Sequence, residues 1–109
     1  MGSGEETRLL DQLYRIQTDL LHSFEMGMLY SSRKWDSAQR ILDVGTGNGY
    51  WLSKTAEIFP EKDYTGIDLD GELIEIANTE FAALNLRFEK ENILDTGGRF
   101  DYIIVRFVI

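Results

Sequence analysis

The chain contains the stretch Arg40-Ile41-Leu42-Asp43-Val44-Gly45-Thr46-Gly47-Asn48-Gly49, in which a short apolar strand runs directly into a loop with three glycines. The next segment, Tyr50 to Phe59, has apolar side chains on one helical face, and Pro60 follows its end. Glycines between a strand and a helix allow the backbone to approach a ligand closely at the helix N-terminus. The stretch therefore predicts a strand, a ligand-binding loop and a helix in succession.

The same order of elements recurs along the rest of the chain. A second strand is predicted at 63–68, and a second helix from an N-cap at Asp70 to about Leu84. Further strands are predicted at 86–90 and 100–107, and the last is apolar enough at its centre to be buried on both faces. Such alternation favours parallel pairing through right-handed crossovers. The predicted fold class is α/β, a Rossmann-like parallel sheet of about four strands with flanking helices.

A long amphipathic helix is predicted before the first strand, over residues 5–30. Large apolar residues recur along it at steps of three and four, and we expect this stripe to face the core; it consists of Leu9, Leu13, Ile16, Leu20, Phe24 and Met28. His22 lies off the stripe and is expected on the surface. With a polar connector, this helix forms an N-terminal unit, 5–39, ahead of the α/β unit, 40–109.

Composition and charge narrow the classes of partner. The chain has 109 residues, 43% of them apolar, which predicts one small globular domain. Its formal net charge is −8, with 13 acidic and 6 basic residues at 41–109. Such a surface repels a phosphate backbone, so we expect no nucleic-acid partner and better tolerance of a cationic ligand.

Several kinds of chemistry are excluded by residues that the sequence lacks. The absence of cysteine excludes disulfides, thiolate metal sites and thiol nucleophiles, and a single histidine excludes a two-histidine metal site. We therefore expect no metal site. No apolar run approaches the length of a membrane span, so we also expect no membrane partner and a cytoplasmic location.

Both ends of the chain suggest that it is not a natural domain. Residues 1–4 are typical of an added leader and have no secretion signal. The other end, Arg106 to Ile109, stops on an apolar strand without a polar cap. We therefore expect a truncated or engineered chain.

The spacing of the loop glycines selects among nucleotide-like ligands. A dinucleotide fingerprint, Gly-x-Gly-x-x-Gly, would need a glycine where this chain has Tyr50. In addition, Asp43 precedes the first glycine by two positions. A pyrophosphate has no use for a carboxylate there, whereas a positively charged ligand group does. The loop thus favours a ligand other than a dinucleotide.

Taken together, three motifs resemble the class I S-adenosylmethionine-dependent methyltransferases. Ile41 to Gly49 matches the first motif of that family, Tyr64 to Asp70 resembles the second, and Phe100 to Val105 resembles the strand-four motif. The resemblance covers roughly residues 30–109 and corresponds to the N-terminal, cofactor-binding half of the family domain. It implies the strand order 3-2-1-4.

The resemblance also implies roles for individual residues. Asp43 would face the methionine amino end of S-adenosylmethionine, Asp68 would accept hydrogen bonds from both ribose hydroxyls, and Asn92 stands where the family often has an aspartate beside adenine. Leu69 and Ile93 would contact the adenine ring, and Arg106 would line the methionine side. The implied cofactor-binding residues are Asp43, Gly45, Thr46, Gly47, Asn48, Gly49, Asp68, Leu69, Asn92, Ile93 and Arg106.

Simpler interpretations stand beside these roles. Asp43 would also serve to satisfy loop amides, Asn92 would serve as a turn residue, and Tyr50 and Trp51 are more typical of helix packing than of base stacking. No catalytic base is assigned, since a lone His22 on a long helix is typical of the surface.

In the family, residues that bind the methyl acceptor come largely after strand four. We therefore expect a fragment that binds S-adenosylmethionine or S-adenosylhomocysteine with little or no turnover. An exposed strand-four edge would pair with another copy and give a homodimer. Alternatives are an active small-molecule methyltransferase completed by dimerisation, a nicotinamide or adenosine-nucleotide domain, and a folded scaffold whose site is a relic.

Overall fold

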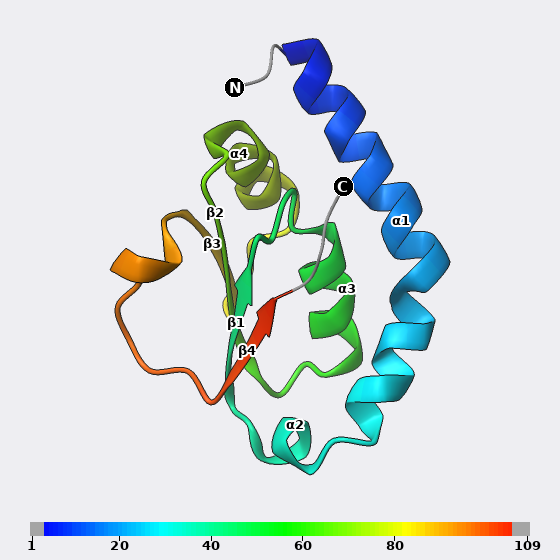
Figure 1. The fold of residues 1–109 in the computed structure, drawn as a ribbon, viewed down its shortest axis with the longest axis vertical. Coiled ribbons are helices and arrows are strands. Elements are labelled where there is room, and N and C mark those ends of the chain that lie inside the picture. The colour runs from blue at the N-terminus through cyan, green and yellow to red at the C-terminus, as the bar shows by residue number, and fades with distance from the viewer. Residues whose placement is uncertain (1–3, 106–109) are drawn as a thin grey trace.

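Parallel strands form one four-stranded sheet in the order β3-β2-β1-β4 (Figure 1). The computed structural model describes residues 4–105. Its elements are α1 (Gly4–Tyr30), α2 (Arg33–Ser37), β1 (Arg40–Val44), α3 (Tyr50–Ile58), β2 (Asp63–Asp68), α4 (Gly71–Glu80), β3 (Leu86–Lys90), the 3-10 helix η1 (Ile93–Asp95) and β4 (Tyr102–Val105). The predicted α/β class and strand order are confirmed.

Strand β1 lies at the centre of the sheet, and its register places Asp43 between two strands. Asp43 pairs with Gly66 of β2 on one side and with Ile104 of β4 on the other, and it is fully buried. Because the strands are parallel, β1 and β2 end at the same edge of the sheet. The glycine loop after Val44 and the segment after Asp68 therefore meet there.

Helices cover one face of the sheet, and the segment that contains η1 lies on the other side (Figure 1). Helix α3 packs near β2, and α1 runs along α3. The largest fully buried side chains lie where the helices meet the sheet and include Trp35, Ile41, Leu52 and Tyr64. The expected N-cap of α4 is present, because Asp70 Oδ1 accepts from the backbone N–H of Glu72 and Leu73.

The apolar stripe of α1 faces away from the core, and the expectation that it packs inward is wrong. Leu20 is 76% exposed and Phe24 72% exposed, and the rest of the stripe is exposed as well. The opposite face is buried instead, with Thr7, Thr18, His22 and Met26 against the body of the domain.

Polar complementarity explains this choice of face. His22 Nε2 lies 2.9 Å from Thr55 Oγ1 of α3, and Trp51 Nε1 donates to Glu25 Oε1 at 2.8 Å. The prediction of a surface His22 is therefore wrong, since a buried hydrogen bond and an edge-on contact with the Trp51 ring hold it. Helix α1 also begins at Gly4, which had been assigned to the leader; residues 1–3 lie outside the described part of the chain.

Two further elements differ from the sequence prediction, since α4 ends before Leu84 and β4 begins at Tyr102 and not at Phe100. Helix α4 ends at Glu80, and Leu84 is fully exposed on the turn before β3, where Ala83 and Leu86 form an isolated bridge. In β4 only Ile104 is buried, while Ile103 and Val105 are exposed. The expectation of burial on both faces is wrong for this strand.

Candidate functional site

The glycine loop between β1 and α3 depends on backbone conformations that favour glycine. Gly45, Gly47 and Gly49 have φ values of 76°, 63° and 80°. A side chain at Gly49 would also collide with β3, since a Cβ there would lie 2.7 Å from the Phe88 ring. The loop can therefore curl tightly over the end of β2.

Four N–H groups of the loop donate within the protein. Gly45 and Thr46 donate to the carbonyl of Ile67 at 2.9 Å, and Gly49 donates to the carbonyl of Thr46. Gly47 donates to Asp68 Oδ2 at 2.9 Å. A phosphate cradle needs such N–H groups to point at the ligand. The N–H groups of these four residues are therefore not available to a phosphate.

Asp68 ends β2 and joins the loop to the next segment. Its Oδ2 accepts from Gly47, and its Oδ1 accepts from the backbone N–H of Asp70 at 2.9 Å. The residue is only partly buried. Each carboxylate oxygen has more than one acceptor site, so further donors can still bind.

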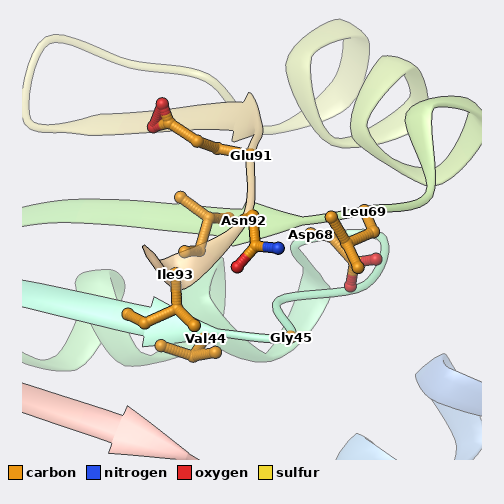
Figure 2. Close-up of a pocket in the computed structure, with 8 residues that line it drawn as sticks. Val44, Gly45, Asp68, Leu69, Glu91, Asn92 and Ile93 are labelled. Carbon is orange, nitrogen blue, oxygen red and sulfur yellow. The ribbon is translucent and has the colours of Figure 1, made fainter. Parts of the chain in front are cut away.

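A cavity of about 210 Å³ adjoins Asp68 at the carboxyl edge of the sheet (Figure 2). It brings together several residues that the sequence predicts for the cofactor, namely Gly45, Asp68, Leu69, Asn92 and Ile93. Figure 2 shows Asn92 between Ile93 and the Asp68–Leu69 pair in this view. Val44, Ile67 and Glu91 complete the lining and were missed. The lining combines apolar walls with a few polar groups, as small-molecule sites do.

Asn92 has a structural role as well as a place in this cavity. Its Oδ1 accepts from the backbone N–H of Leu94 at 2.9 Å and so caps η1. The turn interpretation is therefore correct, while its contact with adenine stays a prediction. Glu91, the residue before it, is held by its backbone N–H, which donates to the carbonyl of Asp68.

A second cavity, of about 10 Å³, lies between the glycine loop and α1. Thr46, Gly47 and Asn48 line it from the loop, and Gly45 lines both cavities. The remaining lining residues come from helices: Tyr14, Gln17 and Thr18 of α1 and Trp51 of α3. None of the α1 residues was predicted, because they are on the face of the helix opposite its apolar stripe.

Asn48 and Tyr14 hold α1 over the loop. Asn48 Nδ2 donates to Asp11 Oδ1 at 2.6 Å, and a Cβ at Gly47 would lie 3.1 Å from the Tyr14 ring. Burial, with the negative charges of Asp68 and Asp70, raises the pKa of Tyr14 above its ordinary value. The neutral phenol is therefore favoured beside these carboxylates.

The structure does not place two of the predicted cofactor-binding residues, Asp43 and Arg106, beside either cavity, and Tyr50, for which helix packing is expected, contacts α1. Arg106 falls outside the described residues. Asp43 is fully buried in β1 and lines neither of the two cavities next to the loop. Tyr50 donates to Asp19 of α1 at 2.7 Å, a hydrogen bond that raises the pKa of its phenol.

Two features are absent from residues 4–105. This part of the chain has no cluster of three or more histidine, aspartate or glutamate residues able to hold a metal ion. Within the same range, no helix has the length and apolar character needed to cross a membrane.

The curated proteins similar to this chain include methyltransferases with different substrates. Malonyl-[acyl-carrier protein] O-methyltransferase of Bacillus anthracis is 31% identical over 96 residues, which are 86% of this chain and 35% of that protein. Ribosomal RNA small subunit methyltransferase G of Cytophaga hutchinsonii is 32% identical over 98 residues, 90% of this chain and 43% of that protein. The chain therefore spans well under half the length of these relatives.

Solved structures share the fold. The plantazolicin methyltransferase BpumL in complex with SAH matches with a TM-score of 0.68 and 24% identity, over 94% of this chain and 42% of that chain. SAM-bound CalS10, an amino pentose methyltransferase from Micromonospora echinaspora, matches with a TM-score of 0.62 and 25% identity, over 79% of this chain and 35% of that chain. The sheet and its helices are thus those of a methyltransferase fold.

A family model described as "Methyltransferase domain" matches residues 41–109. This span starts in β1 and includes the glycine loop, Asp68 and the segment with Asn92. The match extends over more than half of the sequence, and the chain therefore belongs to the methyltransferase domain family.

Proposed function

We propose that the chain binds S-adenosylmethionine, and its product S-adenosylhomocysteine, at the carboxyl edge of the sheet. The position of Asp68 carries the proposal, because its carboxylate adjoins a cavity of about 210 Å³ with largely apolar walls. A ribose presents two neighbouring hydroxyl donors that suit a carboxylate. Leu69 and Ile93 flank space for a flat apolar ring such as adenine.

The glycine loop favours this cofactor over a nicotinamide or adenosine nucleotide. Its N–H groups at Gly45, Thr46 and Gly47 already donate within the protein, which leaves little to hold a pyrophosphate. The fold of proteins solved with SAM or SAH supports the same choice. We infer that the nucleotide alternative is the weaker one.

Calorimetric titration tests the proposal directly. S-adenosylhomocysteine is titrated into the wild type, Asp68→Asn and Asp63→Asn, with NADH as the control ligand. Asp63 begins the same strand at its opposite end and pairs with Arg87 there. We expect Asp68→Asn to weaken binding by about tenfold or more, since hydrogen bonds to a charged group are the stronger kind. Asp63→Asn should bind as the wild type does.

Two outcomes contradict the proposal. One is the absence of heat with S-adenosylhomocysteine for the wild type, and the other is equal binding of NADH. A normal thermal transition for each variant shows that loss of binding is not loss of fold.

Little or no turnover by this chain alone is the second part of the proposal. The chain spans 35% and 43% of the methyltransferases described above, and the residues for a methyl acceptor are expected beyond β4. Turnover is measured as the formation of S-adenosylhomocysteine from S-adenosylmethionine in the presence of small-molecule acceptors. Steady turnover would favour the alternative, an active methyltransferase completed by dimerisation.

Homodimerisation through β4 is the third part. Within the described sheet β4 pairs only with β1, and Ile103 and Val105 are exposed on it. An unpaired, apolar strand edge tends to pair with another chain. Light scattering after size-exclusion chromatography tests this, and a monomer at high concentration contradicts it.

We also propose that nucleic acid is not a partner and that the chain is cytoplasmic. The net charge of −8 supports the first statement, although ribosomal RNA methyltransferases are among the relatives. The absence of cysteine fits a reducing compartment. Retention of RNA by the chain at low salt would contradict the first statement.

A further inference from the structure

The second cavity has buried oxygen atoms that lack partners. Gln17 Oε1 of α1 and Thr46 Oγ1 of the loop are both buried, and neither has a hydrogen-bond partner among residues 4–105. Both residues line this cavity. Buried polar atoms without partners are rare and costly, so a ligand that supplies donors would stabilise this arrangement.

On its loop side, the cavity offers few free hydrogen-bond donors. The loop N–H groups of Gly45, Thr46 and Gly47 donate elsewhere, and the Asn48 amide donates to Asp11. The fully buried Asp43 lies two residues before Gly45, the first glycine of this loop. A cation that donates hydrogen bonds suits this environment, and an anion does not.

The small volume of this cavity limits the kind of ligand group that it can hold. A cavity of about 10 Å³ accepts a group of about one heavy atom, such as a water molecule or a primary ammonium. Gly45 lines this cavity and also the larger one beside Asp68. A ligand whose adenosine occupies the larger cavity can therefore reach the smaller one across Gly45.

We propose that Gln17 accepts a hydrogen bond from the α-ammonium at the methionine end of the cofactor, with Thr46 Oγ1 as a second acceptor. This proposal rests on the proposed function and assigns a residue of α1 to the same site. Gln17 then determines specificity, because it distinguishes the amino-acid-bearing cofactor from adenosine compounds that lack the ammonium. Helix α1 thereby completes a site whose other parts follow β1, β2 and β3.

The test compares two ligands on two variants by calorimetry. The ligands are S-adenosylhomocysteine and 5′-(3-carboxypropyl)thioadenosine, which keeps the carboxylate and lacks the ammonium. The variants are Gln17→Met, which removes the acceptor at similar length, and Gln12→Met, a matched change at an exposed position of α1. We expect Gln17→Met to weaken the binding of S-adenosylhomocysteine about tenfold, because one hydrogen bond to a charged group is lost. The affinity for the ligand without the ammonium should change by no more than about twofold. Gln12→Met should change the affinity for neither ligand.

A thermal transition without ligand separates this role from a structural one. We expect Gln17→Met to be at least as stable as the wild type, because the substitution removes a buried acceptor that has no partner in the described part of the chain. A less stable variant with equal losses for both ligands would show that Gln17 only shapes the helix.

The remaining outcomes also decide the matter. Equal affinity of the wild type for both ligands, or an unchanged affinity of Gln17→Met for S-adenosylhomocysteine, overturns the role of Gln17 but leaves the adenosine site standing. Binding of neither ligand by the wild type means instead that the proposed function itself fails.

Discussion

Asn48 connects three parts of the molecule through one side-chain amide. Its Nδ2 donates to Asp11 of α1, and its Oδ1 accepts from the backbone N–H of Tyr50 at the start of α3. Gly49, the N-cap of α3, makes no side-chain cap, so Asn48 satisfies an N–H that would otherwise lack an acceptor. The side chain is almost fully buried.

We expect Asn48→Ala to lower the free energy of unfolding by about 2 kcal/mol, because it removes a helix-capping acceptor and a buried donor together. Urea denaturation measures this change. The control is Asn78→Ala, which loses only a hydrogen bond to the carbonyl of Phe88 from an exposed position. A loss for Asn48→Ala no larger than for Asn78→Ala would contradict the assigned role.

Asp101 acts at the other end of the sheet. Its Oδ2 accepts from the backbone N–H of Gln39 at 2.9 Å and of Arg40 at 3.0 Å, and these hydrogen bonds hold its pKa below the ordinary 3.8. A lowered pKa means that the charged form is bound better in the folded state. The contribution to stability is therefore present above the ordinary pKa and is lost as the pH falls through the lowered one.

The variant Asp101→Asn keeps an oxygen for both N–H groups and removes the charge. We expect it to be less stable than the wild type near neutral pH, with a difference that shrinks by roughly pH 3. Urea midpoints at both pH values measure it, with Asp95→Asn of η1 as the exposed control. A difference that does not depend on pH would show that the charge has no part in it.

At the scale of elements, α1 shows what a hydrophobic pattern leaves open. The exposed stripe and the buried face are both continuous along the helix, and the sequence alone favours the stripe for burial. The structure buries the other face because His22, Glu25 and Asp11 find partners on Thr55, Trp51 and Asn48.

We therefore expect the pair Leu20→Gln and Phe24→Gln to change the free energy of unfolding by about 0.5 kcal/mol or less, as exposed substitutions usually do. Met26→Ala, on the buried face, should cost about 2 to 3 kcal/mol. Thermal denaturation compares the two. Equal losses would mean that the stripe is buried in solution.

The sheet and the cavity beside Asp68 were predictable because their signals are local. A strand followed by glycines, and a strand that ends at Asp68, place their side chains at one edge once parallel pairing is inferred. Glu91 lacked such a signal, since a residue beside Asn92 could equally face solvent. The contribution of α1 was beyond local patterns, because Tyr14 and Gln17 meet the glycine loop only after the chain folds back over some thirty residues.

At the scale of the whole molecule, the helix held over the glycine loop has a kinetic consequence. The cavity beneath α1 measures only about 10 Å³, and Asp11 of α1 is bound to the loop. Contacts farther along tether the same helix, such as Arg15 to Glu80 of α4 at 2.9 Å. We expect a ligand to reach Gln17 only after α1 moves.

We expect the observed association rate of S-adenosylhomocysteine to approach a plateau as its concentration rises, since opening of α1 precedes entry. Stopped-flow fluorescence of Trp51, which lines the cavity, reports the step. Arg15→Ala removes the ion pairs of Arg15 with Glu80 and with Asp11, which loosens α1, and it should raise the plateau. A rate that rises linearly and identically in both proteins would mean that the site is open at all times. A plateau would mean that the opening of α1, and not diffusion, limits the rate at which the cofactor binds at high concentration.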